Sequence, residues 1–263
     1  MPKNKKMSEA KEKQIENHFN EIDSEIKTCY KIAGKARKQG LDPEDKIDLP
    51  VATNMAERVI GLVSAMAPQI VGTGVSKRIQ ELEEKYGVLD WRVSLVIAEE
   101  VAKEKFCKFK NKLEAMEIGI RVAFSYHTLG TVASPLEGFS SIKLKTRKDN
   151  GKEYFALYFS GPIRSAGGTG ASVSVIIADY IRKVMGYAAY DPTEDEINRM
   201  AVELYDYHDR ITNLQYLPSE EEIRFMVKNL SVQIDGDPSE KIEVSRYKDL
   251  ERVHTNKIRN GIC

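Results

Sequence analysis

The residues best suited to chemistry lie in one stretch, Tyr158–Ser172, in which an apolar run stops at Gly161-Pro162 and turns through small residues. The run before it, Tyr154–Phe159, is aromatic and apolar, as is typical of a buried strand. After it, apolar residues recur at helical spacing from Val173 to Val184. The glycines therefore lie at a strand-to-helix junction, where free backbone N–H groups and the positive end of a helix dipole can receive a phosphate.

The junction yields a candidate phosphate site with a charged residue beside it. Arg164 supplies a guanidinium fork that matches phosphate oxygens, and the glycines leave room for close approach to the backbone. The candidate contacts are Arg164, Ser165, Gly167, Gly168 and Thr169. A tight turn whose glycines only permit positive φ explains the same residues, and both interpretations stay open.

A second group of basic residues precedes the junction. Ser140–Arg147 alternates apolar with basic residues, Asp149-Asn150-Gly151 is a strong turn, and Tyr154–Phe159 returns, which predicts a β-hairpin. Its outer face carries Lys143, Lys145 and Arg147. If these side chains meet the glycine junction, they form a groove suited to a nucleic-acid backbone, bound by charge rather than by base reading.

Other candidate sites have simpler explanations. Asp235 and Asp237 form an Asp-x-Asp pair that suits Mg²⁺, but Asp-Gly and Asp-Pro are ordinary turn residues, and we favour a turn between two strands. The four histidines lack metal-ligand spacing with the cysteines, and we expect His208 to be a surface residue at a helix end. Ser165 and Ser172 lack the context of a nucleophile. We therefore predict neither a catalytic residue nor a metal site.

The composition is that of an ordinary globular protein. Lys+Arg and Asp+Glu are both 40, so no global charge recruits a polyanion, but residues 191–222 carry ten acids against two arginines and residues 103–112 are lysine-rich. This distribution suits a surface that meets a polyanion on one side and a protein on the other. The three scattered cysteines favour a reducing, cytoplasmic setting. No apolar run approaches the roughly 20 residues of a membrane span, and no signal peptide is recognisable.

The elements that position these residues predict an α+β fold. Helical periodicity dominates residues 1–137, which we assign to a helical N-terminal module, and the hairpin opens an α/β module over residues 138–263. The predicted helices of the first module are Ser8–Lys38, Met55–Met66, Val75–Tyr86, one after Asp90, and Leu113–Phe124.

The second module contains further elements with clear boundaries. Asp191-Pro192 opens an acidic helix, and Ser219 is placed as an N-cap with Glu222 completing a capping box. Ser231–Ile234 and Lys241–Val244 read as strands.

Four blocks of the sequence resemble the large subunit of the archaeal family D DNA polymerase. They are Phe159–Thr169, Leu214–Phe225, Val232–Pro238 and Thr255–Gly261, in the order of that family. The resemblance extends over essentially the whole chain and implies a replicative DNA-directed DNA polymerase that works as a heterodimer. In that heterodimer the large subunit synthesises DNA and the small subunit carries a 3′→5′ exonuclease.

The resemblance also limits what this chain does alone. The family's large subunit exceeds a thousand residues, and its Mg²⁺-binding catalytic aspartates lie far downstream, so we expect an inactive N-terminal portion without a cofactor of its own. Cys263 stands inside a block that continues in the family. The implied partners are primer–template DNA, the small subunit and, through the complete enzyme, a sliding clamp, with no membrane.

Two rival functions stay open at this point. Ser165–Ser172 is loosely similar to the glycine-serine phosphate loop of small-molecule kinases, which would predict nucleotide binding without DNA. Alternatively, the chain is an assembly scaffold that holds other parts of the polymerase, and the glycines serve only the turn.

Overall fold

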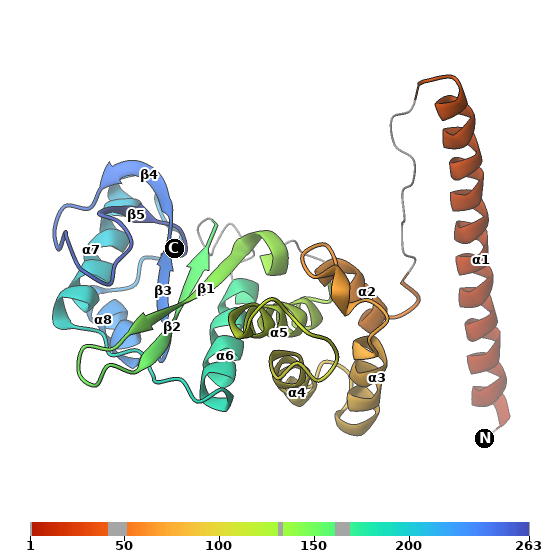
Figure 1. Cartoon of the computed structure of the whole chain (residues 1–263), viewed down its shortest axis with the longest axis horizontal. Coiled ribbons are helices and arrows are strands. Elements are labelled where there is room, and N and C mark those ends of the chain that lie inside the picture. The colour runs from red at the N-terminus through yellow and green to blue at the C-terminus, as the bar shows by residue number, and fades with distance from the viewer. Residues whose placement is uncertain (1, 42–51, 131–133, 161–168, 263) are drawn as a thin grey trace. The chain divides into compact units, whose positions relative to one another are not determined.

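The computed structural model describes residues 2–41, 52–130, 134–160 and 169–262, and it divides the chain into two compact units, Met1–Asn54 and Met55–Cys263 (Figure 1). The first unit is dominated by one long helix, α1 (Pro2–Lys38), which ends before Gly40 in the left-handed conformation. On its apolar stripe, Phe19, Ile22 and Ile26 are partly exposed, whereas Ile15 is exposed. The predicted long amphipathic helix is confirmed.

The second unit begins with a helical layer. Its elements are α2 (Met55–Val63), the short helix η1 (Pro68–Ile70), α3 (Val75–Tyr86), α4 (Trp91–Ala102) and α5 (Lys112–His127). Asp90 caps α4 by accepting a hydrogen bond from the Arg92 amide at 2.8 Å, and Gly87 ends α3 with a positive φ. The apolar faces of these helices enclose one cluster, in which Val59, Ile79 and Ile97 are fully buried.

The remaining elements build two small sheets. They are η2 (Ser134–Gly138), β1 (Phe139–Thr146), β2 (Glu153–Phe159), α6 (Thr169–Val184), α7 (Glu194–Arg210), α8 (Glu220–Asn229), β3 (Gln233–Gly236), β4 (Pro238–Glu243) and β5 (Lys257–Arg259). Strands β1 and β2 form the predicted antiparallel hairpin, and β3 joins β2 in parallel. The second sheet is the antiparallel pair β4–β5. The α+β class is confirmed.

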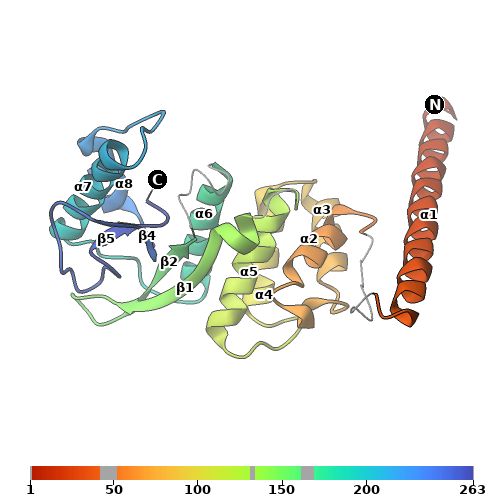
Figure 2. The same cartoon turned by 90° about the horizontal axis from the view of Figure 1, so that it is seen from above.

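The three-stranded sheet has two different faces. Ile142, Phe155, Leu157 and Phe159 point into an apolar core shared with α4, α5 and α6. The strand partners place Lys143, Lys145, Tyr154, Tyr158 and Asp235 on the opposite face, because successive side chains of a strand alternate. Figure 2 shows β1 and β2 beside α6, with α7 and α8 beyond them.

The division into units differs from the division expected at residue 137. The contacts separate the chain between Asn54 and Met55, and one core cluster joins Met116 and Ile120 of α5 to Phe139 and Phe155 of the hairpin. The buried helix α5 therefore packs against elements on both sides of residue 137. Among the described residues, no helix is long and apolar enough to cross a membrane.

Candidate nucleic-acid interface

Two parallel strands end together directly before the glycine stretch in the sequence. Strands β2 and β3 pair Tyr158 with Asp235 and Phe159 with Gly236, so their carboxyl ends meet at one edge of the sheet. The chain leaves this edge after β2 and reaches the start of α6 at Thr169, which confirms the predicted strand before the glycines and the helix after them. In open sheets with parallel strands, ligands commonly bind outside such carboxyl ends.

Most of the predicted phosphate contacts lie outside the described residues. This applies to Arg164, Ser165, Gly167 and Gly168, and also to the side chain of Thr169, whose backbone opens α6. Their role as phosphate contacts stays a prediction.

Lys145 is engaged inside the protein. Its Nζ lies 2.6 Å from Asp235 Oδ2 and donates to the carbonyl of Arg252 at 2.6 Å, and its side chain is only 17% exposed. Burial lowers the pKa of Lys145, although Asp235 favours its charged form. The hairpin face on which we expected an outward row of basic residues is therefore covered here, because the Arg252 segment lies against it.

Arg147 is held in a similar way. Its guanidinium forms an ion pair with Asp149 at 2.6 Å and donates to the carbonyl of Ala189. The hydrogen bonds that Arg147 donates to the Asp149 carboxylate raise the pKa of Arg147. The Asp149 carboxylate and the Ala189 carbonyl hold this arginine beside the hairpin turn. The carboxylate largely compensates its charge.

Lys143 differs from these two residues. It is exposed, and its Nζ lies 3.9 Å from the centroid of the Tyr158 ring, a cation–π contact. Among the described residues it has no ion-pair partner. It pairs with Ala156 in the middle of β2, but its Nζ extends toward the end of that strand, over the ring of Tyr158. Of the three predicted hairpin cations, Lys143 is the one that is exposed.

The Asp235-Gly236-Asp237 segment is not the turn that we expected. Asp235 and Gly236 belong to β3, and β4 begins at Pro238. Asp235 is fully buried, with ion pairs to Lys145 at 2.6 Å and to Arg259 at 2.9 Å. A side chain at Gly236 would collide with the Asn260 carbonyl, so glycine is needed for close packing of the strands. Long-range partners here override the local turn preference.

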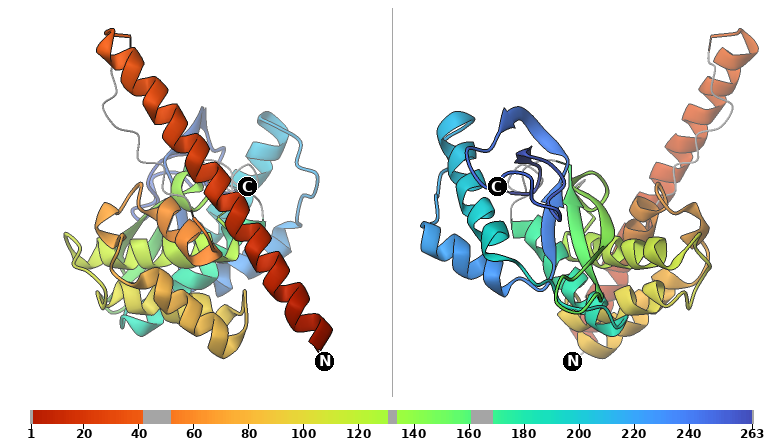
Figure 3. Two further views of the ribbon diagram at one scale, coloured as in Figure 1. Left: turned by 90° about the vertical axis from the view of Figure 1, so that its right-hand side faces the viewer. Right: turned by 60° about the vertical axis from the view of Figure 1, so that its left-hand side comes forward.

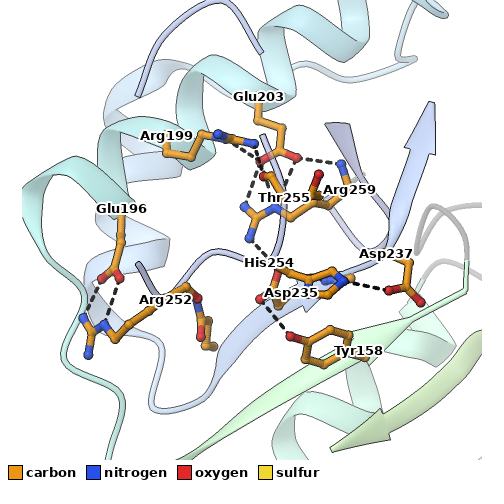
Figure 4. A network of polar contacts seen from close by, with 12 residues as sticks. Tyr158, Glu196, Arg199, Glu203, Asp235, Asp237, Arg252, His254, Thr255 and Arg259 are labelled. Atoms are coloured by element: carbon orange, nitrogen blue, oxygen red, sulfur yellow. Dashed lines mark hydrogen bonds and ion pairs between the residues drawn. The ribbon is translucent and has the colours of Figure 1, made fainter. Parts of the chain in front are cut away.

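The buried Asp235 belongs to a larger network of ions (Figure 4). Arg259 on β5 joins it to Glu203 on α7, and Arg199 pairs with the same glutamate at 3.1 Å. Arg199 also donates to the carbonyls of Thr255 and Lys257. The network ties α7 to both sheets, which gives these charged residues a structural role.

A second part of the network surrounds Arg252. This guanidinium pairs with Glu196 at 2.6 Å and with Asp191, and it lies over the Tyr154 ring. We define the buried ion network as Lys145, Asp191, Glu196, Arg199, Glu203, Asp235, Arg252 and Arg259. The four acids balance the four bases, as a buried set requires.

Sequence reasoning did not find this network. One local signal exists, because Arg199 and Glu203 are four residues apart on a helix, but the same spacing is common on solvated faces. The other pairs join residues from Lys145 to Arg259 that only the fold brings together.

Two histidines take part in local contacts. His254 lies 3.1 Å from Asp237 and meets the Tyr158 ring edge-on, and Lys143 contacts the same ring. His208 is half-buried, and its Nδ1 accepts a hydrogen bond from the Leu214 amide at 2.9 Å. His208 lies in the last turn of α7, as expected, but it is only partly exposed, because the chain folds back toward it after α7. In the described parts of the chain, no three potential metal ligands cluster together.

Comparison with known proteins gives a consistent family. The family model described as "DNA polymerase II large subunit DP2, N-terminal" matches residues 17–263. The DNA polymerase II large subunit of Nanoarchaeum equitans is 47% identical over 246 residues, which are 94% of this chain and 20% of the relative. Those of Methanosarcina barkeri and Archaeoglobus fulgidus are each 40% identical, over 95% of this chain and 21% of the relative.

The chain thus spans about a fifth of the length of the curated relatives it matches. The match includes the sheet edge described above and all residues of the buried ion network. The chain belongs to the DNA polymerase II large subunit family, of which it represents the N-terminal region.

Proposed function

We propose that this chain contributes DNA-backbone binding to the large subunit of a DNA-directed DNA polymerase. The complete enzyme would synthesise DNA with Mg²⁺ at residues outside this region and would act with a small subunit that carries a 3′→5′ exonuclease. No catalytic residue is proposed here. Family membership supports the polymerase role, since the relatives are named large subunits of DNA polymerase II.

One observation carries the role of DNA binding. Lys143 is exposed opposite Ala156 of β2, and its Nζ reaches over the ring of Tyr158, the second-last residue of that strand; the glycine stretch with Arg164 follows β2 directly in the sequence. A cation and a glycine-rich helix start are the two components of a sequence-independent phosphate site. Lys145 and Arg147 would contribute only to the local field, because Asp235 and Asp149 already pair with them.

Salt-dependent DNA binding tests this function. The purified chain is titrated onto fluorescently labelled primer–template DNA over a series of salt concentrations. We expect affinity to fall steeply with salt, and the double variant Lys143→Ala, Arg164→Ala to bind less tightly, with a salt slope reduced by about one per cation removed.

Lys228→Ala is the matched control for this experiment, because Lys228 is an exposed lysine on the acidic helix α8. It should leave both the affinity and the slope unchanged. Equal binding by wild type and the double variant would contradict a phosphate site at this edge.

A second candidate function is favoured by the internal pairing of Lys145 and Arg147, which reduces the charge left for DNA. In this alternative the chain is an assembly scaffold for the small subunit or for other parts of the polymerase. Capture of the small subunit by a chain that binds no DNA at low salt would support the scaffold.

A further inference from the structure

Helices α7 and α8 leave an apolar groove open between them. The groove has a volume of about 180 Å³ and is lined by Met200 and Leu204 of α7, Ile223 and Met226 of α8, and Ile262. Figure 3 shows the two helices side by side. A cluster of buried residues, with Ile197 and Val227 among them, holds the helices together beneath the groove. The walls are therefore helices packed on a shared core, and no side chain of the described residues fills the opening.

A second hollow adjoins the first one. It has a volume of about 250 Å³ and is lined by Tyr216, Pro218, Glu222, Phe225 and Met226. Tyr216 and Phe225 are each 70% exposed and Met226 is 50% exposed, although all three are large apolar side chains. Met226 lines both hollows, and we call the two hollows together the α8 groove. An exposed apolar surface of this kind marks an interaction site.

The charged residues of α7 and α8 indicate which kind of partner suits the α8 groove. Glu220, Glu221 and Glu222 form the first turn of α8, and Glu222 lines the groove. Residues 191–229 expose six carboxylates against the cations Arg210 and Lys228 and the partly exposed Arg224, which pairs with Glu220. The exposed carboxylates are Glu194, Asp195, Asp209, Glu220, Glu221 and Glu222. A negative surface repels a polyanion, so this face is unsuited to DNA and complementary to a basic polypeptide.

We propose that the α8 groove binds a basic amphipathic helix of a partner polypeptide. Two hollows that share Met226 accept successive apolar anchors on one face of that helix. Its lysines and arginines then face the acidic first turn of α8. The exposed aromatic rings of Tyr216 and Phe225 provide the large contact areas typical of such interfaces.

The test uses defined peptides with the complete 263-residue chain. One labelled peptide of about 18 residues carries leucines at helical spacing with lysines between them, and a second keeps the leucines but replaces lysine by glutamate. Fluorescence anisotropy at low salt should show the lysine peptide binding at least about tenfold more tightly, with the preference declining as salt rises.

Variants locate the bound peptide. Met226→Gln should weaken binding of the lysine peptide by about tenfold, because it places a polar group between the hollows. Glu221→Gln should weaken it by about twofold. Val71→Gln is the matched control, since Val71 is 60% exposed on another part of the second unit, and it should change nothing. All these positions are exposed, and thermal unfolding verifies that each variant folds.

Three results would overturn the proposal. The first is equal affinity for the two peptides, and the second is unchanged binding by Met226→Gln. The third is a light-scattering mass showing that the chain dimerises through Met226, which would assign the groove to a second copy.

Discussion

The two faces of the three-stranded sheet are stabilised in opposite ways. On one face Phe155, Leu157 and Phe159 of β2 pack into an apolar core with α5 and α6. On the other face Tyr154 and Tyr158 of the same strand lie against the buried ion network. Apolar packing tolerates many combinations of side chains, whereas a charge buried in the interior requires its particular partner.

The apolar face therefore contributes mainly stability, whereas the ion network contributes the specificity of pairing between elements. The apolar face would accept another hydrophobic strand, but the network fixes which residues of β3, β5 and α7 meet. Figure 4 shows Arg259 between Glu203 and Asp235, so one side chain aligns three elements. We infer that the network sets the position of the sheet edge where the glycine stretch begins, because Asp235 pairs directly with Tyr158 at the end of β2.

The largest effect is expected from Arg259→Leu. This change leaves Glu203 and Asp235 buried without their shared cation, and should lower the free energy of unfolding by about 3–5 kcal/mol. Urea denaturation measures it as a shift of the midpoint. Arg224→Leu is the control, because it breaks an exposed ion pair with Glu220 and should cost about 0.5 kcal/mol or less. Equal losses in the two variants would show that the network contributes no more than surface charges.

Asp235→Asn should have a smaller effect that depends on pH. Burial favours the neutral form of Asp235, but Arg259 and Lys145 outweigh it and hold the pKa of Asp235 below its ordinary value of 3.8. A lowered carboxyl pKa contributes stability that is present above the ordinary pKa and is lost as the pH falls through the folded value. At neutral pH the variant should lose about 1.5–3 kcal/mol.

Urea denaturation at several pH values checks the sign. The difference between wild type and Asp235→Asn should be constant from neutral pH down to about pH 5 and should shrink below the ordinary pKa. A difference that grows as the medium becomes more acidic would mean that Asp235 is protonated in the folded protein.

Structural features that depend on residues close together in the sequence could be predicted, whereas the buried ion network could not. The capping box of α8 was predictable because Ser219 and Glu222 are three residues apart, and the structure confirms both of its hydrogen bonds. The hairpin was predictable from the alternation of Ile142 and Leu144 with lysines. Both signals are local, so they need no knowledge of the fold.

The candidate site could be predicted only in part. The strand before the glycines and the helix after them were correct, but the partners of Lys145 were not visible, since Asp235 is 90 residues away. The turn chemistry of Asp235-Gly236 pointed to a loop, but the segment pairs with the end of β2 as a strand, and Asp235 is buried in an ion pair with the distant Arg259. Buried charges depend on partners that local patterns do not specify.

Gly119→Ala tests the apolar side of the comparison with the smallest expected effect. Gly119 lies inside α5, where alanine normally favours the helix, but an added Cβ would stand 2.5 Å from the Ala98 carbonyl oxygen of α4. The small residues Ala98 and Ala102 let the two helices approach closely, so the methyl group must push them apart. We expect a loss of about 1–3 kcal/mol by urea denaturation. This loss should be the same at acidic and neutral pH, because no ionised group is involved; Gly61→Ala, where nothing lies within 4 Å of the added Cβ, should be neutral or stabilising.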